Sequence, residues 1–126
     1  MTDFLGVDDV LTLHANQVNL YGGQQGVRDL GLLESALAQP LATFGGQSLH
    51  TDVFEMAAAY LFHVVQNHPF LDGNKRTGAV AALVFLDLNG VEIDAPKGSL
   101  YELTMRVATG HANKDQIADY FRSHTH

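Results

Sequence analysis

The sequence contains no cysteine in its 126 residues, few basic side chains and no long apolar run. Without cysteine there is no disulfide framework, which is compatible with a reducing cytosol. The apolar stretches are interrupted by His63, Asp87 and small residues, so none approaches the length of a membrane span. Residues Met1 to Phe4 lack the basic start and apolar run of a signal peptide. We therefore expect a cytoplasmic protein that does not associate with membranes.

Positive charge is scarce, since seven Lys and Arg stand against 14 Asp and Glu, for a formal net charge of −7. Nucleic-acid binding depends on basic surface that displaces counterions, so we expect no direct contact with nucleic acid. The chain length suits a single domain over residues 1–126. A hydrophobic fraction of 46% is ordinary for a globular protein. An acidic protein with one local basic spot suits a small anionic ligand, and a nucleotide is the leading candidate.

Apolar periodicity predicts a sequence of helices joined by short connections. The expected helices cover about 8–21 with Asp8 as N-cap, 29–39, the apolar run 53–65 capped by Thr51 or Asp52, about 74–88, 99–109 and 113–123. Residues 41–50 are expected to form a loop or a small hairpin, residues 91–93 a short strand paired with the N-terminal arm, and the tail with His124 and His126 a disordered end. The predicted fold class is all-α, a bundle around two central apolar helices with at most a small β accessory.

The stretch from His68 to Thr77, HPFLDGNKRT, lies between the two most apolar runs of the chain. Gly73 and Asn74 tolerate positive φ and can turn backbone N–H groups toward one point. A helix that starts near Asn74 adds its own free N–H groups, and such a helix start binds anions, phosphate especially. The stretch therefore predicts a phosphate site with a titratable base and a carboxylate beside it.

Three side-chain roles follow, each with an alternative. His68 suits a general base because neutral imidazole is favoured beside cations, and a C-capping histidine is the alternative. Asp72 suits a ligand for Mg²⁺ held against nucleotide phosphates, and helix capping is its alternative. Lys75 and Arg76 resemble an ordinary solvated pair, but at a helix start they oppose the helix dipole, which indicates that an anion binds there. Phe70 is expected to anchor the loop in the core.

With these residues the stretch resembles the Fic/Doc family, whose core motif reads H-x-F-x-D/E-G-N-G-R-x-x-R. The matching positions are His68, Phe70, Asp72, Gly73, Asn74 and Arg76. The chain from Tyr21-Gly22-Gly23 onward is also similar to the small death-on-curing (Doc) toxin branch. The resemblance implies an all-α fold, in agreement with the periodicity.

The chain departs from the motif at two positions. Lys75 replaces the second glycine, and Ala79 stands where adenylylating Fic enzymes carry their second arginine. The Doc branch carries this same lysine and is implied to bind ATP in the reverse sense, with the γ-phosphate presented for transfer. The implied reaction is phosphorylation of a protein Ser or Thr, with elongation factor Tu as the implied target and arrest of translation as the result.

The resemblance also implies a role for each site residue. His68 would deprotonate the target hydroxyl, Asp72 would hold Mg²⁺, and Gly73, Asn74, Lys75 and Arg76 would stabilise the transferring phosphoryl group. Residues Phe44, Gly45, Gly46 and Gln47 match in place the family's target-docking flap.

The family's inhibitory pattern S/T-x-x-x-E-G/N is not convincingly present, because Glu55 is followed by Met56. We therefore expect control by a separate small antitoxin. Two alternatives to the kinase remain: transfer of AMP by a divergent Fic enzyme, and a catalytically silent relative that binds an antitoxin.

Overall fold

The computed structural model describes residues 1–126, except for the side chain of Phe44. Its helices are α1 (Val7–Tyr21), α2 (Leu30–Ala38), a 3₁₀ turn η1 (Gln39–Leu41), α3 (Val53–Asn67), α4 (Asn74–Leu88), α5 (Ser99–Ala108) and α6 (Lys114–Ser123). A hairpin of two-residue strands, β1 (Thr43–Phe44) and β2 (Gln47–Ser48), precedes α3. The prediction of an all-α bundle with a small β accessory is confirmed.

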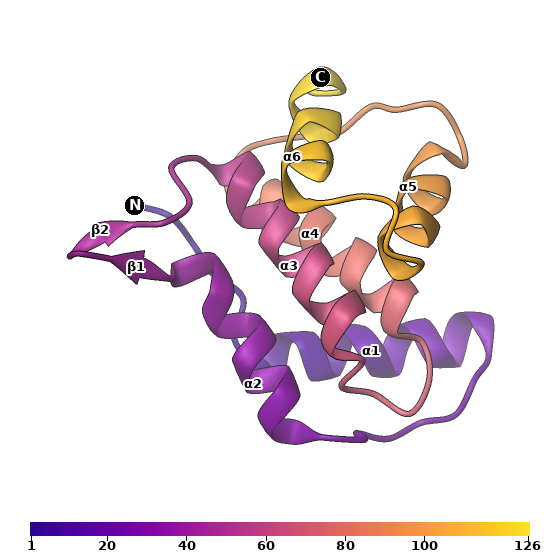
Figure 1. Ribbon diagram of the computed structural model, residues 1–126. Coiled ribbons are helices and arrows are strands. Elements are labelled where there is room, and N and C mark those ends of the chain that lie inside the picture. The colour runs from indigo at the N-terminus through magenta and orange to yellow at the C-terminus, as the bar shows by residue number, and fades with distance from the viewer.

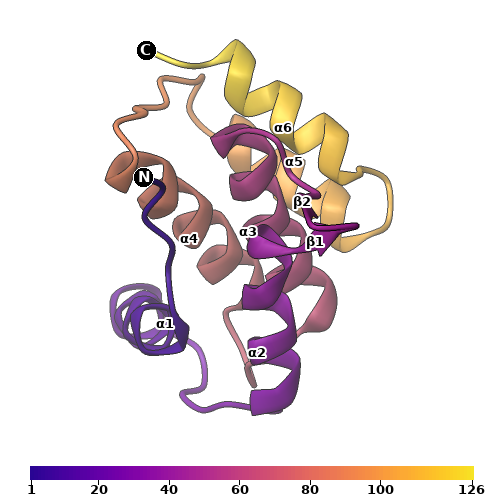
Figure 2. The ribbon, with the colours of Figure 1, turned by 90° about the vertical axis from the view of Figure 1, so that its left-hand side faces the viewer.

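The pair α3 and α4 forms the centre of the bundle. Helix α3 packs against α2, α4, α5 and α6, and α1 packs against α4. In both ribbon views α1 and α2 lie on one side of this pair, and α5 and α6 lie on the other (Figures 1 and 2). Alanines from both central helices are fully buried, with Tyr60 and Phe85 in ring contact at 5.0 Å between centroids. The apolar character of these two helices therefore reflects burial on several sides.

Side-chain caps set the beginnings of three helices. The carboxylates of Asp29 and Asp52 accept from the N–H groups of Leu32 at 3.0 Å and Glu55 at 2.8 Å, and the Asn113 side chain accepts from Gln116. These are the interactions that such residues make at helix starts. The prediction of Asp8 as a cap is wrong, because α1 begins after Gly6, whose N–H bonds to the Asp9 carboxylate at 2.8 Å.

Two expectations about the ends of the chain are also wrong. Ile93 forms its isolated bridge with Thr125 near the C-terminus and not with the N-terminal arm. Asp94 N donates to His124 O at 2.8 Å, and His126 N donates to Glu92 O at 2.9 Å, so the tail is ordered. The N-terminal arm is held instead by the Asn89 side chain, which bonds both the N–H and the C=O of Asp3. None of the helices described has the length and apolar character needed to cross a membrane.

Gly78 permits the close contact between α3 and α4. A Cβ atom at this position would lie 3.0 Å from Val65 Cγ2 and 3.2 Å from the carbonyl oxygen of Leu61. The carbonyl belongs to the α3 backbone and cannot move without shifting that helix. The α3–α4 loop, which carries the motif, is therefore held by two helices at a fixed separation.

We expect Gly78→Ala to lower the free energy of unfolding by about 1–2 kcal/mol, because overpacking against the backbone exceeds the gain in helix propensity. Urea denaturation monitored by circular dichroism measures the change. Gly31→Ala is the control, since its Cβ would meet no backbone atom and only a side-chain oxygen of Asp29, at 3.3 Å. Equal midpoints for the two variants would contradict the role assigned to Gly78.

Candidate active site

The loop between α3 and α4 begins with a left-handed turn at His68. This residue has φ 52° and ψ 54° and is the C-cap of α3. Pro69 follows, and proline disfavours the right-handed helical conformation in the residue before it. The backbone turns away from the helix axis here and leaves the His68 side chain exposed at the rim of a cavity. The alternative of a C-capping histidine thus describes its position correctly, and that position is compatible with a catalytic role.

Asn74 fixes the curvature of this loop. Its side-chain oxygen accepts from Phe70 N at 2.9 Å, and its side-chain nitrogen donates to Phe70 O at 3.1 Å. Asn74 is only 3% exposed, and Phe70 is fully buried, as expected of a core anchor. The Asn74 side chain is therefore committed to the loop, and its backbone N–H at the start of α4 remains the group that can face a phosphate.

Helix α1 supports the same loop through His14. Its ring stacks on Phe70 at 3.8 Å between centroids with an interplanar angle of 5°, and its Nε2–H donates to the carbonyl oxygen of Asp72 at 2.8 Å. This role of His14 was not predicted from the sequence. The only signal was a polar side chain one turn from Val10 and from Val18 on the buried face of α1.

A second support comes from the segment between α1 and α2. Val27 forms an antiparallel bridge with Phe70, and Leu71 N donates to Gly26 O at 3.1 Å. The guanidinium of Arg28 bonds the carbonyl oxygens of His68 and Asn67. From the sequence this segment was expected only to connect two helices, and its contacts with the motif were not predicted.

The N-terminus of α4 presents free hydrogen-bond donors. Gly73 is its N-cap with φ 76° and provides no side chain to cap it, and the first turn contains no acidic residue. Thr77 N is the first donor to bond back along the helix, to Gly73 O at 3.0 Å. The preceding N–H groups have no intrahelical partner, and the helix dipole adds partial positive charge to them. This arrangement is suited to an anion.

Asp72 is held at the edge of this helix start by backbone donors. Its Oδ2 accepts from Gln24 N at 3.2 Å, and its Oδ1 accepts from Gly73 N at 2.9 Å. These hydrogen bonds, followed by the charges of Arg76 and Lys75, lower the pKa of Asp72 below its usual value. The side chain is exposed and does not cap α4, so the capping alternative is wrong.

Of the side chains that the structure describes around the cavity, Asp72 is the one carboxylate that could take part in holding a metal ion. Among the described residues no three His, Asp or Glu side chains are grouped as metal ligands. The described residues therefore contain no site in which protein side chains alone would complete the coordination of a metal ion. A single ionised carboxylate beside a phosphate site is what Mg²⁺ uses when phosphate oxygens and water complete its coordination.

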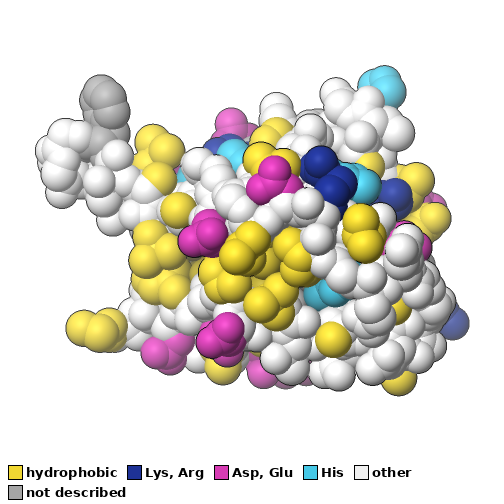
Figure 3. Space-filling model, turned by 90° about the horizontal axis from the view of Figure 1, so that it is seen from below, with side chains coloured by type: hydrophobic (Ala, Val, Ile, Leu, Met, Phe, Trp, Pro, Cys, Tyr) yellow, Lys and Arg dark blue, Asp and Glu magenta, His cyan; other side chains and the backbone are white. Residues whose placement is uncertain are grey.

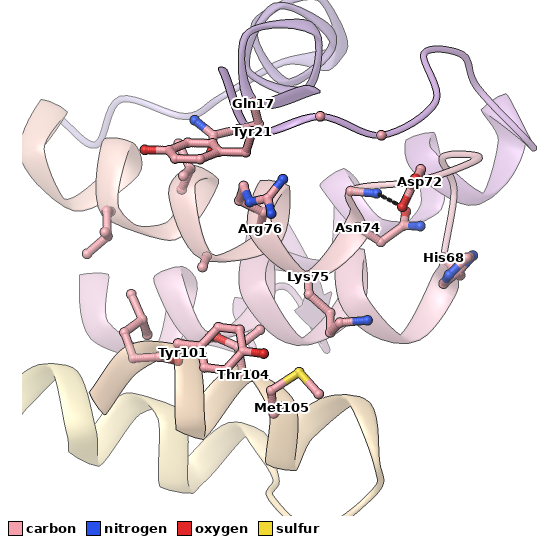
Figure 4. A pocket seen from close by; sticks show the side chains of 17 residues that line it. Gln17, Tyr21, His68, Asp72, Asn74, Lys75, Arg76, Tyr101, Thr104 and Met105 are labelled. Carbon is pink, nitrogen blue, oxygen red and sulfur yellow. Dashed lines mark hydrogen bonds between the residues drawn. The ribbon is translucent and has the colours of Figure 1, made fainter. Parts of the chain in front are cut away.

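Lys75 and Arg76 extend from α4 in different directions (Figure 4). The Arg76 guanidinium lies over the Tyr21 ring at 4.8 Å from its centroid, whereas the Lys75 side chain points toward α5. Neither cation forms a salt bridge in the described part of the chain. Two cations at a helix start without carboxylate partners favour binding of an external anion.

These groups surround one cavity of about 680 Å³. Its walls are the end of α1 with Gly22 and Gly23, the α3–α4 loop with the first turns of α4, and one face of α5. The charged groups stand at the loop end, and apolar side chains line the rest. The apolar lining residues are Ala79, Val80, Leu83, Leu100 and Met105.

The structure brings most of the predicted site residues together. The cavity is lined by His68, Asp72, Gly73, Asn74, Lys75 and Arg76, and also by Gln17, Tyr21, Tyr101 and Thr104, which the sequence analysis missed. For Tyr21 the signal was available, because it precedes the glycine pair that ends the first helix.

The predicted flap lies elsewhere in the fold. The hairpin with Phe44, Gly45, Gly46 and Gln47 precedes α3, whereas His68 follows it, so a 15-residue helix separates them. Such a helix is about 22 Å long, and Figure 1 shows the hairpin at its far end. Of the flap residues with described side chains, none lines the cavity. The structure therefore does not place this hairpin beside the motif.

Comparisons with known proteins agree with this arrangement. Residues 4–86 match the model of the Fic/DOC family. The chain is 41% identical over 120 residues to "Toxin Doc" of Mycolicibacterium smegmatis. The aligned residues make up 94% of this chain and 90% of that relative. It is 36% identical over 116 residues to "Protein kinase doc" of Escherichia phage P1, and the aligned residues make up 91% of this chain and 90% of that relative. With the motif assembled in one cavity and most of the sequence matched by both relatives, this chain belongs to the Fic/DOC family and to its Doc branch.

Proposed function

We propose that this protein is a Doc-type toxin that transfers the γ-phosphoryl group of ATP to a Ser or Thr hydroxyl of a translation factor and so arrests translation. Elongation factor Tu is the implied target. The observation that carries the proposal is Lys75, a cation without a salt-bridge partner in the described residues, in the cavity that contains His68 and the start of α4. The name of the phage P1 relative, "Protein kinase doc", supports the same chemistry.

The proposed reaction assigns one step to each group. His68 accepts the proton of the target hydroxyl, whose oxygen attacks the γ-phosphorus while the bond to the bridging oxygen breaks and ADP leaves. The donors of α4 with Lys75 and Arg76 stabilise the charge on the transferring group, which is the main task in phosphoryl transfer. Asp72 would hold Mg²⁺, which neutralises phosphate charge when bound.

The apolar end of the cavity suits the nucleoside. Ala79 is one turn along α4 from Lys75 on the same helix face, Val80 and Leu83 continue the lining along α4, and Leu100 lines the cavity from α5. A nucleotide with its γ-phosphate at the loop can extend its base toward this region. The absence of a cation at position 79 removes the group that seats the far phosphates in adenylylating relatives. This difference favours presentation of the γ-phosphate.

A small cognate antitoxin is the proposed regulatory partner, as the toxin name of the Mycolicibacterium smegmatis relative suggests. Figure 3 shows the molecule from the side where α1 and α2 lie and shows apolar side chains gathered among acidic ones. Exposed leucines of α1 and α2 include Leu20 and Leu30. An apolar region of this kind is typical of a surface that binds another protein.

The transferred group is the direct test of the proposal. We expect purified protein, incubated with ATP and bacterial lysate, to label one protein from γ-labelled ATP and none from α-labelled ATP. Labelling from the α-phosphate would identify nucleotidyl transfer and contradict the proposal. Absence of both labels would favour a silent relative that only binds its partner.

We expect His68→Ala to reduce the transfer rate by about 10²-fold or more, because a positioned general base is lost. The fold should survive, since the side chain is exposed at the end of α3. Initial rates with γ-labelled ATP and a thermal melt measure the two effects separately. A variant with the wild-type rate would remove His68 from the base role.

The double change Lys75→Gly with Ala79→Arg restores the adenylylating pattern at both departures. We expect it to lose γ-phosphoryl transfer by about 10²-fold or more, since one lost donor to a developing charge has an effect of this size. Intact-mass analysis of the target distinguishes a phosphoryl from an adenylyl adduct. Phosphorylation at the full rate by the double variant would show that Lys75 does not set the orientation of ATP.

A further inference from the structure

The backbone of His68 is held in an unfavourable conformation. Among the described residues it is the only one other than glycine with positive φ. A Cβ atom disfavours this region, so such a conformation persists only where the surroundings enforce it. The direction of the imidazole follows from this backbone turn. Groups that hold the turn therefore control where the proposed base points.

Arg28 makes the direct side-chain contacts with this turn. Its Nε donates to His68 O at 2.8 Å, and its Nη2 donates to Asn67 O at 3.0 Å. These are the carbonyl oxygens of the last residue of α3 and of its C-cap. The last carbonyls of a helix lack intrahelical partners and carry the negative end of the dipole, where a cation is stabilising. Helix α3 has no basic residue in its own last turn, so the cation comes from another segment.

The position of Arg28 is itself fixed by backbone pairing. The N–H groups of Arg28 and Asp29 both donate to Pro69 O, at 2.8 and 3.0 Å. With the Val27–Phe70 bridge, these bonds place the segment antiparallel to the loop. The planar guanidinium can then bond two adjacent carbonyls at once, which the single ammonium of a lysine does less well.

We propose that Arg28 is a positioning residue that holds the left-handed turn of His68 and so directs its imidazole toward the reacting hydroxyl. This inference rests on the proposed function of His68 as general base. Arg28 is not among the residues that line the cavity, so it acts through His68 and not on the nucleotide. Its side-chain hydrogen bonds go to the end of α3 and its C-cap, at the opposite end of the loop from α4.

We expect Arg28→Ala to lower kcat by about 10- to 100-fold, the effect of a small displacement of a catalytic group. The KM for ATP should stay at the wild-type value, because the start of α4 is unchanged. Arg28→Lys keeps one charged donor and should recover part of the lost rate. If the alanine variant does not fold, the comparison of the lysine variant with wild type carries the test.

Arg122→Ala is the matched control, because Arg122 binds the opposite end of α3. Its guanidinium contacts the carboxylates of Asp52 at 2.9 Å and Glu55 at 3.6 Å. Its loss should lower the melting temperature without changing kcat at a temperature where the protein is folded. A wild-type kcat in Arg28→Ala would overturn the proposal. Equal losses of kcat in the Arg28 and Arg122 variants would also overturn it, since they indicate general destabilisation of α3.

A second readout needs no substrate. The three-bond HN–Hα coupling and the Cα and Cβ chemical shifts of His68 report its φ angle in solution. In Arg28→Ala we expect these values to move away from those of a left-handed residue, whereas in Arg122→Ala they should not change. Identical spectra for His68 in wild type and Arg28→Ala would overturn the inference. If wild-type protein transfers no phosphate, the proposed function fails while this measurement still decides the role of Arg28.

Discussion

The site depends on the way one short loop is held between the two central helices. Asn74 bonds both backbone groups of Phe70 from α4, His14 stacks on the same ring from α1, and the segment with Val27 pairs with it along the backbone. Phe70 is fully buried at the point where these contacts meet. Catalytic groups carried on a loop need such support, because a free loop cannot keep a base and a phosphate site in register.

The same contacts explain why polar groups of the motif have different tasks. Asn74 belongs to the motif, but its side chain forms hydrogen bonds with the backbone of Phe70 and so stabilises the loop. The Asp72 carboxylate is oriented by the N–H groups of Gln24 and Gly73. The groups left free are backbone donors at the start of α4, the imidazole of His68 and two cations. In a chain with a net charge of −7 this is a local concentration of positive potential. Such a concentration of positive potential attracts a small anion.

Much of this arrangement could be predicted from local sequence. The beginning of α3 was predicted from a capping residue, Thr51 or Asp52, and the two central helices were predicted from their apolar character. The motif residues were found because their types and spacing are unusual between two buried helices. The roles of His14 and Arg28 were not predictable in this way, because their partners lie 58 and 40 residues away. The pairing of Ile93 with Thr125 was not predicted for the same reason, because it depends on where the chain lies after the end of α6.

The two departures from the family motif can be understood as one change along α4. Positions 75 and 79 are one helical turn apart and lie on the same face, so both project toward the same wall of the cavity. An arginine at 79 with glycine at 75 places the positive charge one turn inside the helix. Lys75 with Ala79 places it at the helix start, about 6 Å nearer to the loop with His68. Arg76 lies on the adjacent face, toward α1. A triphosphate bound as proposed would therefore meet both positive charges at its terminal part. The phosphorus atom nearest to His68 would then be the terminal, γ-phosphorus of the triphosphate.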